Sequence, residues 1–229
     1  MKTLGLIGGL SWFSTAEYYR IINQLTNDRL GDSNSAKLFL YSINFNEFKT
    51  LQEDGDWQQI EIMLTEIALQ LENAGADCIV MCSNTPHCVA DGVQHKINIP
   101  LLHIAEETAK EIAKQKIRKV GLLGTKFTME HSFFRKRLSR YNIQANIPDA
   151  EDRDFIHLSI FNQLTKGIFT TETKNRYLDI IEKLREDGAE GIILGCTEIS
   201  LMIKQEDCVL PLFDTTAIHT KSAVDFMLQ

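Results

Sequence analysis

The sequence predicts an α/β protein of two pseudo-symmetric lobes, each a parallel four-stranded sheet flanked by helices. The first observation is that apolar runs alternate with helix-like segments along all 229 residues, which favours parallel sheets covered on both faces. The second is a duplication: a helix end, a glycine, a buried strand and a polar tip occur twice. Aligning Gly75 with Gly188 (188 − 75 = 113) also aligns Ser83 with Cys196 (196 − 83 = 113). The duplication therefore indicates two similar lobes.

The first lobe is predicted to comprise 1–100 plus 211–229. It opens on an apolar strand at 2–9 that ends in Gly8-Gly9. Ser14 or Thr15 is a plausible N-cap for the next helix, and Gly31 ends that helix. The remaining expected elements are strands at 37–43, 77–82 and 99–102 and helices at 16–30, 57–73 and 88–96.

The second lobe is predicted over 101–210 and repeats this pattern. Gly121 aligns with Gly5 at an offset of 116 (121 − 5 = 116) within a strand at 119–125. Apolar residues at Tyr177, Ile180, Ile181 and Leu184 make the helix at 172–187 amphipathic. The other expected elements are helices at 106–115, 125–141 and 151–165 and strands at 142–147, 190–195 and 209–214, followed by a closing helix at 217–228. The last helix is expected to return to the first lobe.

Composition excludes several classes of protein. The net charge is −7 and no dense Lys/Arg run exists, so nucleic acid and other polyanions are not expected partners. The N-terminus enters an apolar strand without a signal-peptide layout, and no apolar stretch approaches the roughly 18 residues of a membrane span. Five cysteines without CxxC spacing favour free thiols in the cytoplasm over disulfides or a zinc site. The GxGxxG and GxxxxGK[ST] patterns are absent, which disfavours a nucleotide site.

Polar residues follow the two duplicated strands, at the edge where parallel sheets bind ligands. We expect Ser83 and Cys196 to form two walls of one active site in a cleft between the lobes. A helix starting at Thr197 should lower the pKa of the Cys196 thiol and create a base or nucleophile. The alternative interpretation is an inert core cysteine, which is the commoner fate of this residue type.

The other candidate residues each have a structural alternative. Five neutral donors at strand ends suit carboxylate oxygens, although each one could serve as a helix cap: Asn84, Thr85, Thr125, Thr128 and Thr197. The turn at Gly8-Gly9 should let Ser11 approach a small ligand. His87 fits equally well as a residue that orients a base and as a helix-start residue, while His219 fits a structural role. Cys78 and Cys82 are expected in the core because side chains alternate along a strand, and Cys88 and Cys208 are expected to be structural.

Taken together, the motifs resemble those of the aspartate/glutamate racemase family. They are Gly8-Gly9-Leu10-Ser11-Trp12 with Tyr18-Tyr19, Ser83-Asn84-Thr85 with His87, Gly195-Cys196-Thr197-Glu198, and the segment Phe213 to His219. They occur in the family's order and cover essentially the whole chain. The resemblance implies a homodimer that racemises acidic amino acids without a cofactor or metal. One acid/base residue from each lobe is then expected on each face of the substrate Cα.

One departure from the family pattern concerns the first catalytic position. The family has Cys-Asn-Thr where this chain has Ser83-Asn84-Thr85, so only Cys196 matches a catalytic cysteine. The sequence is therefore similar to the L-aspartate/glutamate-specific branch, which has a hydroxyl residue in that place and converts its substrate in a lopsided manner. A hydroxyl is a far weaker acid or base than a thiol, so we expect the reaction through Ser83 to be slow.

The resemblance also implies the residues that bind the substrate. Lys166 matches a family position for the substrate carboxylate, while no second cationic anchor is evident in Asn46-Glu47-Phe48-Lys49. The expected substrate-binding residues are Ser11, Asn84, Thr85, Thr125, Lys166, Thr197 and Glu198. Two alternatives keep the scaffold: a decarboxylase or isomerase of small dicarboxylic acids, and a non-catalytic dicarboxylate-binding protein.

Overall fold

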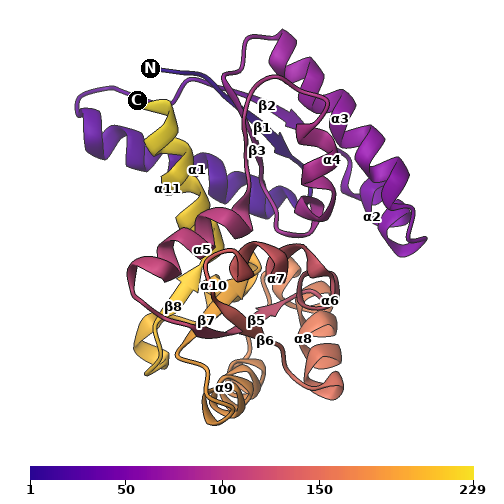
Figure 1. The fold of residues 1–229 in the computed structure, drawn as a ribbon, viewed down its shortest axis with the longest axis vertical. Helices are drawn as coiled ribbons and strands as arrows, with labels where there is room; N and C mark the ends of the chain where they lie inside the picture. Colours follow the sequence, from indigo (N-terminus) through magenta and orange to yellow (C-terminus); the bar gives the residue numbers. More distant parts are fainter. The chain divides into compact units, whose positions relative to one another are not determined.

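The computed structural model describes residues 1–229. The chain folds into two compact units. Unit 1 contains Met1–Ile104 and His219–Gln229, and unit 2 contains Ala105–Ile218. Each unit holds a four-stranded, all-parallel sheet flanked by helices (Figure 1). The predicted α/β class and the two four-stranded parallel sheets are thus confirmed.

In unit 1 the strand order is β2-β1-β3-β4. The strands are β1 (Leu4–Gly8), β2 (Leu38–Ser42), β3 (Cys78–Met81) and β4 (Leu101–Leu102). The helical segments are α1 (Trp12–Leu30), α2 (Phe45–Glu53), α3 (Trp57–Asn73), the 3₁₀ turn η1 (Thr85–Val89) and α4 (Ala90–Gln94).

The two faces of this sheet bury separate apolar clusters, because successive strand residues point to opposite sides. Leu4 and Leu6 pack with Tyr18 of α1 and Val224 of α11 (Thr215–Met227). Ile7 faces the other side, where α3 and α4 cover the sheet (Figure 1). The sheet therefore has helices on both faces, and its strand ends are left for polar residues.

In unit 2 the strand order β6-β5-β7-β8 repeats that arrangement. The strands are β5 (Lys119–Gly124), β6 (Gln144–Asn146), β7 (Gly191–Gly195) and β8 (Leu212–Asp214). The helical segments are α5 (Ile104–Lys114), α6 (Lys126–Glu130), α7 (Ser132–Ser139), α8 (Ala150–Asn162), η2 (Leu164–Lys166), α9 (Thr171–Glu186), α10 (Thr197–Met202) and η3 (Gln205–Asp207).

The unit boundaries differ from the predicted 1–100 plus 211–229 and 101–210. Leu101 and Leu102 form β4, which pairs with β3 and so belongs to unit 1. Leu212–Asp214 form β8, which pairs with β7 and so belongs to unit 2. Each boundary therefore follows a sheet's fourth strand, and the chain returns to unit 1 only within α11.

Two helix predictions also need correction. The helix α2 was not predicted; Asn44 caps it by accepting the Asn46 backbone N–H at 3.2 Å. The helix expected at 125–141 is two helices, because His131 has an extended backbone with ψ 149° between α6 and α7. Both errors concern local capping and backbone geometry, which the hydrophobic pattern does not specify.

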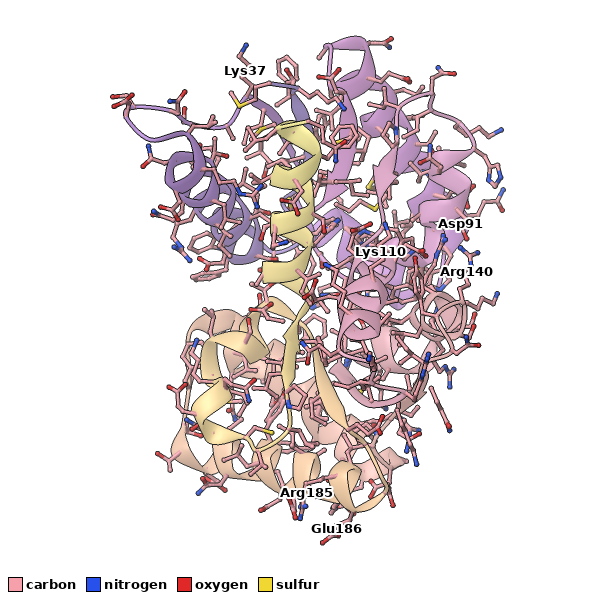
Figure 2. The ribbon with its side chains drawn as sticks, turned by 60° about the vertical axis from the view of Figure 1, so that its left-hand side comes forward. Lys37, Asp91, Lys110, Arg140, Arg185 and Glu186 are labelled. Carbon is pink, nitrogen blue, oxygen red and sulfur yellow. The ribbon has the colours of Figure 1, made fainter.

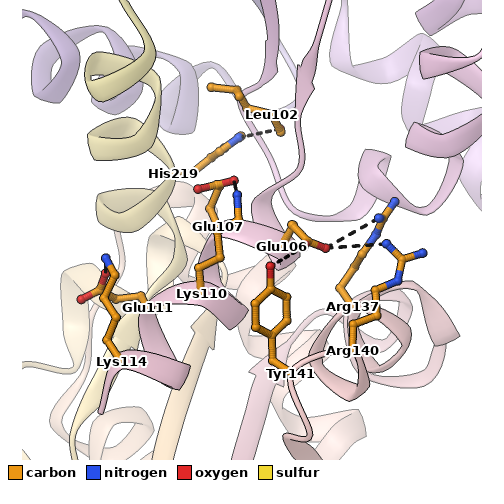
Figure 3. Close-up of polar contacts among 10 residues, drawn as sticks. All are labelled: Leu102, Glu106, Glu107, Lys110, Glu111, Lys114, Arg137, Arg140, Tyr141 and His219. Atoms are coloured by element: carbon orange, nitrogen blue, oxygen red, sulfur yellow. Dashed lines mark hydrogen bonds and ion pairs between the residues drawn. The ribbon is translucent and has the colours of Figure 1, made fainter. Parts of the chain in front are cut away.

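A polar network in unit 2 joins α5 to α7 and the residues that follow it (Figure 3). The Tyr141 hydroxyl donates to Glu106 at 2.6 Å. Arg137 and Arg140 lie 3.6 and 3.8 Å from the second Glu106 oxygen.

Other charged side chains, including Lys37, Arg185 and Glu186, extend from the surface (Figure 2). No helix combines the length and the apolar character that crossing a bilayer requires.

Candidate active site

The end of β3 carries Ser83 at the start of a buried polar turn. Ser83 is half-buried, and Asn84 and Thr85 behind it are 5% and 7% exposed. Two successive backbone carbonyls at this tip are held by side chains. The Ser14 hydroxyl donates to the Cys82 carbonyl at 2.8 Å, and His87 Nδ1 lies 2.9 Å from the Ser83 carbonyl. The turn that presents Ser83 is therefore fixed from behind.

Cys78 and Cys82 lie in the core, as their alternation along the strand predicted. Both side chains have no solvent exposure. Burial raises the pKa of Cys78 to about 12 and raises that of Cys82 further. The Cys82 thiol is fully buried and stays protonated at neutral pH, so the sulfur next to Ser83 is not available to act on a substrate.

Three buried histidines of unit 1 cluster behind the Ser83 turn. The ring centroid of His87 lies 4.9 Å from that of His103 and 5.4 Å from that of His219. His219 Nε2 donates to the Leu102 carbonyl at 2.8 Å (Figure 3), so its Nδ1 accepts from the Tyr18 hydroxyl at 2.9 Å. His219 is thus a structural residue, as the sequence indicated.

The surroundings of His87 keep its imidazole uncharged at neutral pH. Burial lowers the pKa of His87 well below its ordinary value, and the charges that His103 and His219 can carry lower it further. The Ser83 and Leu102 carbonyls oppose this effect without reversing it. No group of His, Cys, Asp or Glu side chains in the protein is arranged to hold a metal ion.

The end of β7 carries Cys196 as the N-cap residue of α10. Gly124 of β5 lies opposite Gly195 of β7 in the sheet. Thr125 and Cys196 are the next residues after this pair, one after each strand. A Cβ atom on Gly195 would lie 2.7 Å from the Leu123 carbonyl oxygen. Only glycine fits there, and the strand end is consequently held close to its neighbour.

Cys196 forms a hydrogen-bonded pair with Glu198. The Sγ–H donates to Glu198 Oε2 at 3.0 Å, and Glu198 is 4% exposed. Burial, followed by the negative charge of Glu198, raises the pKa of Cys196 well above its ordinary value, while the backbone N–H groups of α10 lower it less. The expected lowering of this pKa is therefore wrong: the helix start acts in the expected direction, but burial and the carboxylate outweigh it.

The beginnings of α10 and α11 are linked to each other beside Cys196. The hydroxyls of Thr197 and Thr216 lie 2.9 Å apart, and Thr215 donates to the Leu194 carbonyl at 2.9 Å. Asp214 caps α11 by accepting the Thr216 N–H at 2.9 Å. These bonds fix the turn that presents Cys196, and they give Thr197 a structural partner in addition to its predicted role.

The remaining predicted residues have local structural roles as well. Ser11 caps α1 in place of the predicted Ser14 or Thr15, so the helix begins at Trp12 and not at 16. Ser11 has a φ of 130°, a strained conformation for a residue other than glycine. Gly9 packs closely on the Ile43 backbone, because a Cβ there would lie 2.1 Å from the Ile43 carbonyl oxygen, and the approach of Ser11 to a small ligand stays a prediction. Thr125 caps α6 by accepting the Thr128 N–H at 3.2 Å. Lys166 is exposed at the end of η2, which contacts α10.

The role of Glu198 as the partner of the thiol was missed from the sequence. The relevant signal is a carboxylate two residues after a cysteine that ends a buried strand. In this position the helix start turns the Glu198 side chain back toward the N-cap residue. Sequence spacing alone does not distinguish that orientation from one that faces a substrate.

Changing Glu198 to Gln should lower the pKa of Cys196, because the carboxylate charge opposes formation of the thiolate. We expect iodoacetamide to alkylate Cys196 roughly 3- to 10-fold faster at pH 7 in Glu198→Gln. The alkylation–pH curve should move to lower pH, yet remain above that of an exposed cysteine because burial persists. Mass spectrometry of the Cys196 peptide gives the rate, and Glu198→Asp, which keeps the charge, is the matched control. An unchanged curve in Glu198→Gln would refute the assigned cause.

Known proteins similar to this chain point to one family. The Asp/Glu/Hydantoin racemase family model matches residues 7–223. The broad-specificity amino-acid racemase RacX of Bacillus subtilis is 25% identical over 232 residues, covering 98% of each chain. Solved structures extend this similarity to the fold. A Yersinia pestis protein provisionally described as an Asp/Glu racemase is 47% identical with a TM-score of 0.95. An aspartate racemase homologue from Pyrococcus horikoshii is 37% identical with a TM-score of 0.88. Both comparisons cover 100% of each chain.

Proposed function

Because this chain belongs to the Asp/Glu/Hydantoin racemase family and is an amino-acid racemase, we propose that it interconverts the antipodes of aspartate or glutamate without a cofactor. Cys196 acts on one face of the substrate Cα and Ser83 on the other. The observation that carries this proposal is the thiol–carboxylate pair of Cys196 and Glu198 at the end of β7. Its counterpart at the end of β3 is a hydroxyl.

The Cys196 half of the reaction begins with a protonated thiol. The Sγ–H proton passes to the Glu198 carboxylate along their 3.0 Å hydrogen bond. The thiolate then removes the Cα proton, and the electron pair of the broken C–H bond remains on the substrate as a carbanion. Because Cα–H groups are very weak acids, the carbanion requires preorganised donors on its carboxylate. Ser11, Asn84, Thr85, Thr125, Lys166 and Thr197 are the proposed donors.

The Ser83 half of the reaction is slower in this proposal. Ser83 returns a proton to the opposite face of the carbanion, and in the reverse direction its oxygen must remove one. The His87 imidazole cannot take the hydroxyl proton of Ser83 through Nδ1, because that nitrogen is hydrogen-bonded to the Ser83 carbonyl. A hydroxyl without a general base is a weak acid and a weaker base, so this side limits the rate of inversion.

A second candidate substrate class is amino acids with neutral side chains. At the start of α2, Asn44 donates to Glu47 at 3.3 Å, and the Lys49 ammonium lies 3.5 Å from Glu53. The Lys49 ammonium is therefore already paired with a carboxylate of the protein, so this segment offers no unpaired cation to the side-chain carboxylate of a substrate. A broad-specificity racemase among the relatives is in keeping with this candidate.

A panel of pure L-amino acids tests the proposed function. With L-aspartate or L-glutamate, chiral chromatography should show the D-antipode accumulating without any added cofactor. Homoserine and asparagine, matched to aspartate in size, test the neutral class. Binding of aspartate without inversion or Cα–H exchange would refute the racemase proposal and support a binding protein, and loss of CO₂ would support a decarboxylase.

We propose that the protein forms a homodimer in the cytoplasm. The edge strand β2 exposes three successive apolar side chains, Phe39, Leu40 and Tyr41, at 40%, 43% and 38%, and an uncovered apolar edge favours pairing. Sedimentation equilibrium should give twice the chain mass of 26.1 kDa, and a mass of one chain would refute the dimer.

The proposed cytoplasmic location is supported by the cysteines. All five are free thiols, which is typical of a reducing compartment.

A further inference from the structure

We propose that His87 is a positioning residue for Ser83, which it holds through the Ser83 backbone carbonyl while remaining a neutral imidazole that takes no part in proton transfer. This inference rests on the proposed function, since it concerns the slower of the two half-reactions. It goes beyond that function because it gives a role to a buried residue that does not act on the substrate.

The hydrogen bond of His87 fixes which ring nitrogen carries the proton. A carbonyl oxygen can only accept, so His87 Nδ1, 2.9 Å from the Ser83 oxygen, must donate. In a neutral ring Nε2 then has no proton and makes no hydrogen bond, because the nearby Leu102 carbonyl is also an acceptor and is bound by His219 instead. The side chain is 1% exposed, and the neighbouring His103 and His219 oppose a positive charge on it. His87 is therefore held as the Nδ1–H tautomer.

The unpartnered Nε2 indicates that His87 does more than fill space. Burying an imidazole nitrogen without a hydrogen bond is unfavourable, and an apolar side chain of similar size would avoid that cost. His87 provides an N–H donor, at Nδ1, to the Ser83 carbonyl, and an apolar residue cannot provide one. Ser83 lies two residues beyond Met81, where β3 and its pairing with β1 end, so its carbonyl is outside the ladder of the sheet.

The same tip has a second carbonyl held by a side chain. The Ser14 hydroxyl of α1 donates to the Cys82 carbonyl at 2.8 Å, and the Cys82 N–H donates to the Ile7 carbonyl at 2.9 Å. The peptide on each side of Ser83 is thereby anchored, one by Ser14 and one by His87. Releasing the His87 anchor frees the peptide between Ser83 and Asn84, and a small displacement of a reacting group costs a large factor in rate.

Two substitutions at position 87 separate positioning from packing. In His87→Asn the side-chain N–H₂ occupies the place of Nδ1 and can donate to Ser83, whereas in His87→Gln the donor reaches toward the place of Nε2. For the antipode that reacts through Ser83, we expect kcat for Cα–H exchange to remain within about 3-fold in His87→Asn. We expect it to fall roughly 10- to 100-fold in His87→Gln, with little change in KM. Exchange of the antipode that reacts through Cys196 should be nearly unaffected in both variants.

Three results would overturn the proposal. One is equal loss in His87→Asn and His87→Gln, and another is equal loss for both antipodes in a folded variant, as judged by thermal melting. The third is a shift of the pH–rate profile in His87→Asn, because it would make His87 a proton carrier. In a Ser83→Ala background, His87→Gln should cause no additional loss of exchange, and an additional loss of equal size would also contradict positioning through Ser83.

A measurement on the unmodified protein is independent of activity. Long-range ¹H–¹⁵N NMR of the histidine rings should show His87 as the neutral Nδ1–H tautomer from pH 5 to pH 8. An Nε2–H tautomer, or titration of His87 in this range, would overturn the positioning role even if racemase activity is found. If no substrate is racemised while the NMR shows the Nδ1–H tautomer, the proposed function fails and the structural assignment of His87 stands.

Discussion

Replacing Cys196 with alanine should abolish racemisation of both antipodes, with a loss of roughly 10³-fold or more. Every complete inversion requires the thiol once, either to remove the Cα proton or to return it. We expect that Glu198 does not replace it, because this side chain is 4% exposed. Polarimetry of L- and D-aspartate and glutamate measures the loss in both directions.

The matched control for this prediction is Cys208→Ala. Cys208 is a half-buried thiol of the same unit, at the end of η3 and outside the proposed site. We expect its removal to leave the rate within about 2-fold, as is usual away from a functional site. Racemisation by Cys196→Ala at a rate near that of the unmodified enzyme would show that another group acts on the substrate and would remove the basis of the mechanism.

Changing Ser83 to cysteine should raise the rate of inversion by roughly 10- to 100-fold. A thiol is a much stronger acid than a hydroxyl, so it both gives up and returns a proton more readily. Because Ser83 is half-buried rather than enclosed in the core, the larger sulfur can be accommodated. The rate is measured as the appearance of the opposite antipode by chiral chromatography.

Ser83→Ala serves as the control for the same position. It should stop inversion while preserving deuterium exchange at the antipode that reacts through Cys196. If Ser83→Cys slows exchange of both antipodes, the residue supports the site in another way and does not face the substrate as proposed.

Both proposed acid/base positions could be predicted from the sequence because they depend on a duplicated local pattern. A buried strand, a glycine-marked helix end and a polar tip determine where Ser83 and Cys196 stand in their own units. The structure places Cys196 directly after β7 and Ser83 two residues after β3. The core location of Cys82 followed from alternation alone. These features depend on residues close together in the chain.

The features that could not be predicted depend on side-chain orientation and on distant pairing. The raised pKa of Cys196 results from burial together with the orientation of Glu198, and neither can be inferred from the spacing of the two residues. The unit boundaries depend on β4 and β8, short strands whose partners lie elsewhere in the chain. The donation from His87 to Ser83 likewise depends on the path of η1.

The most direct test of the account is the ratio of deuterium exchange to inversion for each antipode in D₂O. Interconversion of antipodes has an equilibrium constant of unity, so kcat/KM must be equal in the two directions, and the ratio of exchange to inversion reports the difference between the two acid/base groups. We predict that one antipode gains deuterium at Cα about ten times faster than it inverts or more, because Cys196 exchanges its proton faster than Ser83 returns one. The other antipode should invert with nearly every exchange. Equal ratios of exchange to inversion for the two antipodes, measured by proton NMR and chiral chromatography on the same samples, would contradict the pairing of a thiol with a hydroxyl.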